Sequence, residues 1–497
     1  MRPPRFAAWV PAAAALALLP LGGCVSVGPD YRRPETPLPP AYSAAAAGAP
    51  AGEGAEVPDS WWTLFGDPAL DRLVDAALAG NHDLAAAAAR VDEARALAGV
   101  ADAERWPEVT VGTGASRAQL SADANQFPPG FPLATDRVGV TAAVSYEADF
   151  WGRYRRASEA ARAELLATEE GRRNVRLAVA AETVEAYLDL LSFERQWAVA
   201  GETQETRRES VRLQRLRLDA GTISELDLAQ AEAELAATEA TLPAVERALR
   251  QTEHRLNVLL GRSGGAIERG LPLAALIHPE VPVGLPSELL ARRPDVAAAE
   301  LRLVAANARI GVARAAYFPS IALTGYGGSE SSDLAGLFGA GTSVWQAALS
   351  LVEPIFNHGR IRRQVAAARA RERQAVAAYA KAVETAFAEV EDALVARRTG
   401  IAKREALGRQ VEALGRARRL AQARYDAGES SYLEVLDAER NLFLAELALV
   451  RASRAEILAT VALFKAIGGG WEASGSPPRP ADPATLPIAV NQPPRPP

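Results

Sequence analysis

The acidic residues with the most informative spacing occur in two similar stretches, RLDAGTISELDLAQAEAE and RYDAGESSYLEVLDAERN, which begin 207 residues apart. Asp227 in the first stretch and Glu434 in the second each follow a serine by three residues, the spacing of a capping box at a helix start. Capping does not account for Asp437, whose counterpart in the first stretch is Gln230. Asp437 either pairs with Arg440 one helical turn later or has a function that belongs only to the second stretch.

Residues that could support catalysis or hold a cofactor are scattered. The four histidines, His82, His254, His278 and His358, do not have the spacing of a metal site. The chain has neither a glycine-rich loop that would cradle a phosphate nor the strained turn that carries a serine nucleophile. We therefore expect no enzyme, no metal and no cofactor. The net charge of −6 and the absence of a basic block predict no nucleic-acid partner.

The N-terminus reads as a targeting segment. Arg2 and Arg5 precede an apolar stretch that is short for a membrane span, and small residues follow it. The segment resembles a bacterial lipoprotein signal peptide (residues 1–23), in which Cys24, the only cysteine, becomes lipid-modified. A secretory signal followed by an incidental thiol is the alternative. Val25 stands where this class places Asp for retention in the inner membrane, which implies the outer membrane.

No run of about 18 apolar residues follows the cysteine, so a membrane would have to be crossed by strands. Residues 137–150 alternate apolar and polar side chains, and residues 345–351 repeat the pattern. Partner strands are predicted at 108–120 and 320–329. Two ordinary amphipathic hairpins on a soluble core are the alternative. Four strands cannot close a membrane barrel, which needs about eight, so two or three chains would have to share one.

The strands belong to a unit that occurs twice. Residues 82–109 resemble residues 294–321 at an offset of 212, and DFWGRYRR resembles IFNHGRIRR at an offset of 207. Each unit reads as a short helix, two strands, a long helix, a turn and a returning helix. The long helices, 153–219 and 360–427, would each measure about 100 Å. The sequence therefore predicts a tandem internal duplication.

The predicted organisation follows from these units and the connector between them. It comprises a signal peptide (1–23), an extended N-terminal segment (24–68), a first repeat (69–261), a Gly/Pro-rich connector (262–293), a second repeat (294–467) and a Pro-rich tail (468–497).

The returning helices carry leucine or valine every seven residues with small residues between them, which predicts closely packed helix pairs. Glu456 interrupts this pattern in the second helix. Pro243 lies within the first helix, where we expect a kink or a cost of about 3 kcal/mol. Gly201 and Gly408 occupy matching positions in the long helices, for no reason visible in the sequence.

Several motifs in combination point to one family. CVSVGPDYRRPETPLPP follows the signal, the strand–helix unit is duplicated, the RYDAGESSYLEVLDAERN turn is present, and the repeat ends in LFKAIGGGW. The chain resembles outer-membrane efflux channels of the TolC-type family, in the lipoprotein subgroup that serves RND tripartite pumps. The resemblance implies an α+β fold and a homotrimer. A membrane β-barrel shared between three chains, with four strands each, would continue into a long periplasmic α-helical barrel.

The resemblance also implies partners and a gate. The partners would be a periplasmic adaptor protein, an inner-membrane RND-type transporter and outer-membrane lipid. The second turn would lie at the periplasmic tip, with Leu433 as an apolar constriction, Glu434 and Asp437 in an acidic ring, and Tyr425 holding the closed state. Six carboxylates around a narrow axis would raise one another's pKa and attract cations. Ser430 stands where some members have an arginine, which argues against a latch there.

The implied function is a passive exit duct for small molecules. A lipid-anchored periplasmic helical scaffold or adaptor without a pore is the alternative. The duplicated strands favour the channel, because an adaptor needs no such segments. The sequence does not specify the exported compounds, and one methionine and four histidines give no indication of metal export.

Overall fold

The computed structural model describes residues 26–43, 57–121, 123, 128, 132–282 and 289–470. The predicted signal peptide, Cys24 and most of the predicted C-terminal tail lie outside these residues. The chain forms two compact units, which we call the strand unit (Met1–Arg33, Ala94–Leu165 and Arg302–Val376) and the turn unit (Pro34–Glu93, Leu166–Leu301 and Ala377–Pro497).

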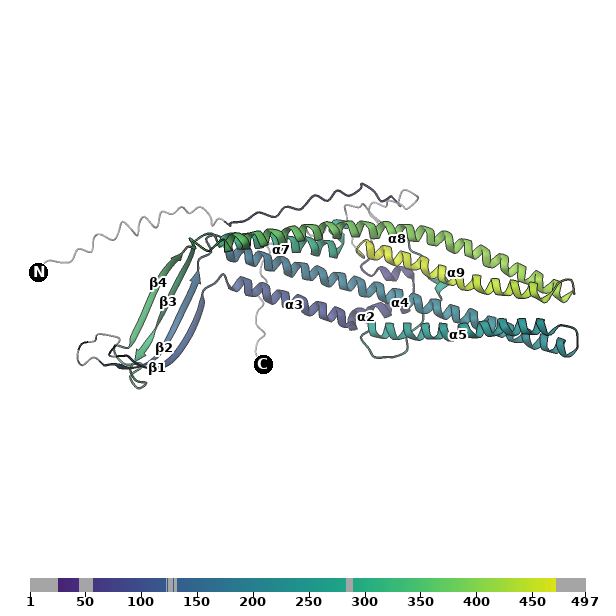
Figure 1. Ribbon diagram of the computed structural model, residues 1–497, viewed down its shortest axis with the longest axis horizontal. Coiled ribbons are helices and arrows are strands. Elements are labelled where there is room, and N and C mark those ends of the chain that lie inside the picture. The colour runs from purple at the N-terminus through teal and green to yellow at the C-terminus, as the bar shows by residue number, and fades with distance from the viewer. Residues whose placement is uncertain are drawn as a thin grey trace. The chain divides into compact units, whose positions relative to one another are not determined.

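The strand unit contains one antiparallel sheet whose strands follow one another in chain order (Figure 1). The strands are β1 (Glu108–Gln119), β2 (Ala134–Glu147), β3 (Ser320–Ser331) and β4 (Ser343–Val352). All four predicted strands are therefore confirmed, with shifts at their ends. β1 and β4 form the two edges of the sheet.

The largest shift is in β2, which ends three residues earlier than predicted. After Glu147 the chain leaves the sheet, and Asp149 binds the start of the next helix, α4. Oδ2 of Asp149 accepts a hydrogen bond from the backbone N–H of Arg155 at 2.9 Å. Such a bond satisfies one of the N–H groups that a helix start leaves without a partner. The alternating pattern continues past this point, so periodicity alone could not locate the end of the strand.

The main helices occur in the same order on both sides of the connector, with equal lengths. They are α3 (His82–Ala103) and α7 (Pro294–Ala315) with 22 residues each, α4 (Arg153–Asp219) and α8 (Arg360–Asp426) with 67 each, and α5 (Glu225–Leu259) and α9 (Tyr432–Ala466) with 35 each. The structure thus confirms both predicted long helices. None of the helices in the described ranges is long and apolar enough to cross a membrane.

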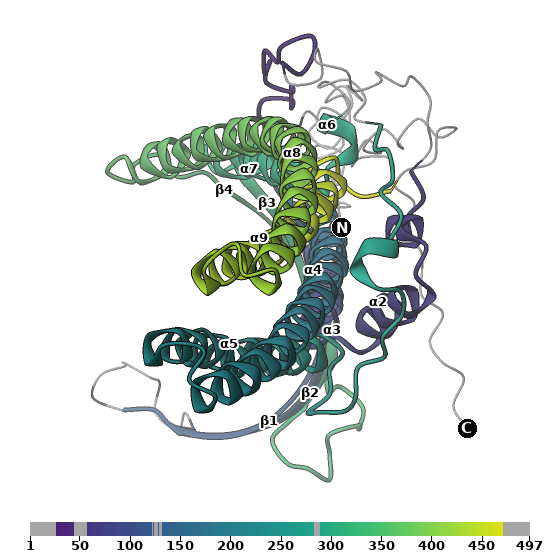
Figure 2. The ribbon, with the colours of Figure 1, turned by 90° about the vertical axis from the view of Figure 1, so that its right-hand side faces the viewer.

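Within the turn unit, α5 runs beside the end of α4 and α9 beside the end of α8 (Figure 2). The predicted seam is buried, chiefly at the positions between its heptad leucines. In α5 the buried residues include Ala231, Thr238, Val245, Thr252 and Leu259. The helix continues through Pro243. A methyl group added at Gly201 or Gly408 would meet no atom within 4 Å outside its own helix, so packing among the described residues explains neither glycine.

Glu456 does not break the seam of α9 as the sequence pattern indicated. Its side chain stays buried because Nε of Arg404 on α8 donates to one carboxylate oxygen. Nδ1 of His278, in the connector, lies 3.2 Å from the other oxygen. A buried carboxylate is tolerated where a cationic partner compensates its charge.

The segments before the first repeat pack on the turn unit. Trp61 lies in a short 3₁₀ helix, η2 (Trp61–Phe65), and its ring stacks on that of Phe464 at 5.0 Å. The buried carboxylate of Asp67 then caps α2 (Pro68–Gly80), accepting from the backbone of Ala69 at 2.9 Å and from the Tyr187 hydroxyl at 2.7 Å. Among the described residues, the other short helices are η3 (Leu273–Ala275) and α6 (Leu289–Arg292).

Candidate gate at the two helix turns

Both turns end their long helix in the same way. Gly221 and Gly428 have φ of 69° and 75°, the left-handed region that glycine adopts without a steric penalty. In each turn the residue after the glycine donates its N–H to the carbonyl five residues earlier, at 2.9 Å. The glycine itself donates to the carbonyl three residues earlier. This is the Schellman arrangement, and it confirms the glycine turns that the sequence predicted.

The two returning helices begin differently, which corrects one prediction. Ser224 and Asp227 form the predicted capping box at the start of α5. The predicted capping box of Ser431 and Glu434 is wrong, because the Ser431 side chain makes no capping hydrogen bond. The Glu434 carboxylate instead accepts from Nη1 of Arg424 at 3.2 Å. A cationic donor in the last turn of α8 forms a charge-assisted bond, which is stronger than a bond to a neutral backbone N–H.

Leu433 and Asp437 lie on the exposed face of α9, one turn apart. The Leu433 side chain is 57% exposed, and Leu226 at the matching position of α5 is 65% exposed. The Asp437 side chain is 56% exposed, accepts from Nη2 of Arg440 at 2.6 Å and accepts from Nδ2 of Asn441 at 3.0 Å. The pairing of Asp437 with Arg440 is thus present within one chain. The carboxylate remains accessible from outside the chain.

Near the turns, Tyr425 connects the helix pair of α8 and α9 to the helix pair of α4 and α5. Its hydroxyl donates to Oε1 of Gln214 on α4 at 3.2 Å, and its ring lies 5.2 Å from that of Tyr432. The Arg217 guanidinium lies 4.9 Å from the centre of the Tyr425 ring, within the range of a cation–π contact. Tyr425 and Tyr432 belong to an apolar cluster with Val211, Ala231, Ala421, Val435 and Leu436. This cluster therefore contains side chains from all four helices.

One central residue of this contact was not identified from the sequence. Arg207 on α4 is buried, and its Nη1 donates to the backbone carbonyl of Glu234 and to Oγ1 of Thr238, at 2.6 Å each. Its Nη2 lies 3.0 Å from a Glu234 carboxylate oxygen, and the guanidinium faces the ring of Phe443 on α9. The matching residue of α8 is Leu414. A cation in one long helix opposite a leucine in the other was the signal that could have revealed it.

Charges around this contact have perturbed acidities. Burial raises the pKa of the Glu439 carboxyl on α9, although the nearby Arg418 and Arg207 partly oppose the shift. Burial also raises the pKa of the Tyr432 hydroxyl.

Ser430 Oγ has no hydrogen-bond partner among the described residues, so no latch at this position is seen within the chain. In the described part of the chain, no cluster of three His, Cys, Asp or Glu side chains could hold a metal ion.

The sequence can now be compared with known proteins. The family model described as outer membrane efflux protein matches residues 73–262 and 285–469, which is most of the chain. The chain belongs to the outer membrane efflux protein family.

Relatives of this efflux protein include components of named pumps. It is 38% identical over 462 residues to the solvent efflux pump outer membrane protein SrpC of Pseudomonas putida, covering 92% of this chain and 98% of SrpC. It is 37% identical over 475 residues to the outer membrane protein OprJ of Pseudomonas aeruginosa, covering 95% and 97% of the two chains. An outer-membrane component of an efflux pump is thus confirmed, and the protein is not an enzyme.

Solved structures agree with this assignment. The CmeC outer membrane channel of Campylobacter jejuni matches with a TM-score of 0.85 at 28% identity, covering 90% of this efflux protein and 96% of that chain. The MtrE outer membrane channel of Neisseria gonorrhoeae, solved in an open state, matches with a TM-score of 0.80 at 31% identity, covering 90% and 99%. The predicted resemblance to TolC-type channels is confirmed. It favours the channel over the scaffold without a pore.

Proposed function

We propose that three copies of this efflux protein form one outer-membrane exit duct, with their twelve strands closing a shared barrel that continues into a helical barrel. The edges β1 and β4 support this arrangement, because an unpaired strand edge is not tolerated in lipid and a neighbouring copy would pair it. Adjacent strands also present exposed apolar side chains opposite one another. These pairs are Val109 with Val144 and Leu323 with Leu349.

The two repeats, whose helices and strands follow one another in the same order, are in this proposal the halves of a tandem duplication. Export through the duct is passive, because the chain carries no motif that would couple it to an energy source. A periplasmic adaptor and an inner-membrane RND-type transporter would supply substrate and energy. Lipid attached to Cys24 would anchor the chain to the outer membrane. The name of SrpC, a solvent efflux pump outer membrane protein, supports the pump partners.

The duct closes at its periplasmic tip through the turn between α8 and α9. The observation that carries this proposal is that Leu433, an apolar residue, is 57% exposed at the turn with Asp437 one turn behind it. In a trimer, the three Leu433 side chains would form one circle around the axis, and the Glu434 and Asp437 carboxylates would form a second circle next to it. Tyr425 would hold α8 against α4 in the closed state. Opening would separate these helices.

Cysteine cross-linking tests the closed tip. In the full-length protein, Leu433→Cys introduces one thiol per chain besides the lipid-modified Cys24. In the closed trimer these thiols come within disulfide distance at the axis, so mild oxidation is expected to give linked dimers. Leu226→Cys, at the matching position of the other turn, is the control and is expected to stay monomeric. Equal cross-linking of the two variants, or none with Leu433→Cys, contradicts closure by the second turn.

A further inference from the structure

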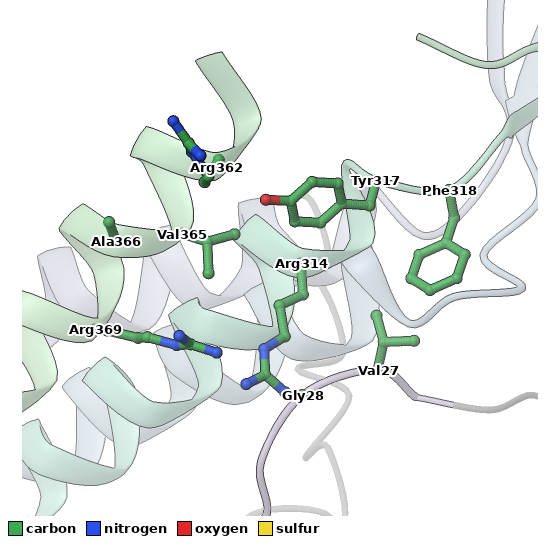
Figure 3. Close-up of a pocket in the computed structure, with 9 residues that line it drawn as sticks. All are labelled: Val27, Gly28, Arg314, Tyr317, Phe318, Arg362, Val365, Ala366 and Arg369. Atoms are coloured by element: carbon green, nitrogen blue, oxygen red, sulfur yellow. The ribbon is translucent and has the colours of Figure 1, made fainter. Parts of the chain in front are cut away.

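The strand unit contains a pocket of about 590 Å³ between the end of α7, the start of α8 and the N-terminal segment (Figure 3). Three arginines line it, Arg314 from α7 and Arg362 and Arg369 from α8. Figure 3 shows the guanidinium groups of Arg314 and Arg369 on the same side of the pocket, with that of Arg314 pointing towards Gly28. None of the three forms an ion pair with any acidic side chain that the structure describes. The sequence has no basic block, but the fold brings these three arginines to one pocket.

The matching place in the first half of the chain holds an ion pair. Asp102 is the second-last residue of α3, and both its carboxylate oxygens accept from Nη2 of Arg162, the tenth residue of α4, at 3.0 and 2.8 Å. The second-last residue of α7 is Arg314, and the tenth residue of α8 is Arg369. The second half thus keeps the arginine of the pair and replaces its carboxylate with another arginine.

A second carboxylate is missing in the same way. Arg155, the third residue of α4, lies 3.5 Å from Oδ2 of Asp149. The third residue of α8 is Arg362, and the position that matches Asp149 is Phe356. Like charges held close together repel one another, so a cluster that has lost its carboxylates is stabilised by an anion from outside. Arginine binds phosphate oxygens through two parallel N–H groups, which makes phosphate a suitable anion.

The pocket wall formed by the N-terminal segment is held in place. Gly28 has a φ of 135° and packs so closely on α7 that a Cβ atom added there would lie 2.7 Å from the Cα of Gly311. Beside it, Val27 and Val365 give the pocket an apolar side, and the Phe318 ring lines it as well. The pocket therefore combines cationic groups with an apolar wall that free phosphate does not need.

The pocket adjoins the end of the sheet that carries exposed aromatic rings. The strand register brings the starts of β1 and β3 and the ends of β2 and β4 to one end of the sheet. Next to these four strand ends the chain exposes Trp106, Phe150, Tyr317, Phe318 and Phe356. Aromatic girdles of this kind lie at the level of lipid headgroups in outer-membrane proteins. Tyr317 and Phe318 belong both to this group and to the pocket lining.

We propose that the pocket binds the phosphate headgroup of an anionic phospholipid, with Arg314 and Arg369 at the phosphate, Arg362 adding positive charge to the pocket lining, and an acyl chain along the apolar wall. The inference rests on the proposed function, because that function places this end of the sheet at the membrane surface. Val27 follows Cys24 by three residues, so the site lies close along the chain to the proposed anchor. The bound lipid would fix the depth of the channel in the membrane.

Native mass spectrometry of the full-length protein in detergent tests this site with phosphatidylglycerol or phosphatidylcholine at equal concentrations. Wild type is expected to retain phosphatidylglycerol about tenfold better than phosphatidylcholine. Arg314→Asp, which restores the carboxylate found in the first half, is expected to lower phosphatidylglycerol binding about tenfold. Arg362→Ala/Arg369→Ala gives a second disruption. The control, Arg371→Ala/Arg373→Ala, removes the same charge from exposed positions of α8 outside the pocket and leaves binding unchanged.

The other possible occupants give different outcomes. Displacement of phosphatidylglycerol by millimolar inorganic phosphate would make this a site for free anions and overturn the proposal. Binding that appears only in Cys24→Ser would mean that the chain's own lipid fills the pocket, which also overturns it. Equal binding of phosphatidylglycerol by wild type and Arg314→Asp would also overturn the proposal. Oligomeric mass is measured on the same samples, so intact trimers without bound lipid refute this inference alone.

Discussion

The Tyr425 hydroxyl on α8 donates a hydrogen bond to the Gln214 side chain on α4 at 3.2 Å, and Gln214 is itself buried. This bond joins the helix pair that carries the proposed gate to the helix pair that does not. In the proposed function, moving α8 and α9 away from α4 and α5 opens the tip, so this bond has to break. The contact of the Arg217 guanidinium with the Tyr425 ring crosses the same boundary, and such a packing contact tolerates some sliding.

Tyr425→Phe removes this hydrogen bond and keeps the ring. A single such bond contributes about 1 kcal/mol, so we expect the open fraction of the channel to rise about fivefold. The measurement is open probability in planar bilayers. Gln422→Ala, which removes a bond between Gln422 and Asp426 on the same helix, is the control and leaves the open probability unchanged. An unaltered open probability in Tyr425→Phe would show that the bond does not hold the closed state.

Arg207→Ala is expected to destabilise the packing of α4 on α5, and with it the contact to Phe443 on α9, by about 3 kcal/mol, because it leaves Glu234 without its buried partner. The measurement is the urea midpoint of the helical signal. The matched control is Arg208→Ala, since Arg208 is the exposed neighbour and pairs with Glu205 at the surface. Equal losses in the two variants would mean that burial of Arg207 adds nothing to the stability of this contact.

Glu439 on α9 makes the packing around Arg207 dependent on pH. Burial raises the pKa of Glu439, so the folded protein binds its proton more tightly than the unfolded chain does. The stability that this group contributes is therefore present below the unfolded pKa of about 4.3 and is lost as pH rises through the folded value.

Glu439→Gln removes this titration, so it should raise the thermal midpoint at pH 7 and lose that advantage towards pH 4. Comparing variant with wild type at each pH cancels the titration of the other carboxylates. A midpoint difference that stays constant across this range would show that Glu439 is not the responsible group.

Two side chains hold the ends of the returning helices in the same way. Nδ2 of Asn81 donates to the carbonyl of Leu259 at 3.0 Å, and Nη1 of Arg293 donates to the carbonyl of Ala466 at 2.9 Å. Arg293 also pairs with Asp295 and Glu389, each at 2.6 Å.

Arg293→Ala should therefore cost about 3 kcal/mol. Asn81→Ala should cost about 2 kcal/mol, because Oδ1 of Asn81 also accepts from the backbone N–H groups of Asp83 and Leu84 and so caps α3. Urea midpoints compare the two variants. A larger loss in Asn81→Ala would show that the charges around Arg293 add no stability.

Much of the fold could be predicted because local patterns specify it. The long helices contain no proline, Gly221 and Gly428 end them, and the alternating pattern of 137–150 identifies a strand. Interactions between distant segments could not be predicted in this way. The Glu434 carboxylate binds the Arg424 guanidinium and does not complete the predicted capping box. The strand β2 ends early because Asp149 accepts a hydrogen bond from the start of α4.

The candidate site shows the same division. Asp437 was found by comparing the two turns and Leu433 through the family resemblance, and the structure leaves both exposed. The partners of Tyr425, and the whole role of Arg207, depend on which of many arginines and glutamines face each other across the two helix pairs. One sequence does not contain that information, because these residues lie far apart along the chain.

Planar-bilayer conductance of the wild type and of Leu433→Ala/Asp437→Ala tests the central claim most directly. The matched control is Leu226→Ala/Gln230→Ala in the other turn. We expect a nearly silent wild type, a steadily conducting Leu433→Ala/Asp437→Ala channel and a control like the wild type. Silence of all three folded, inserted proteins, or equal conductance of the two double variants, would contradict a gate at the second turn.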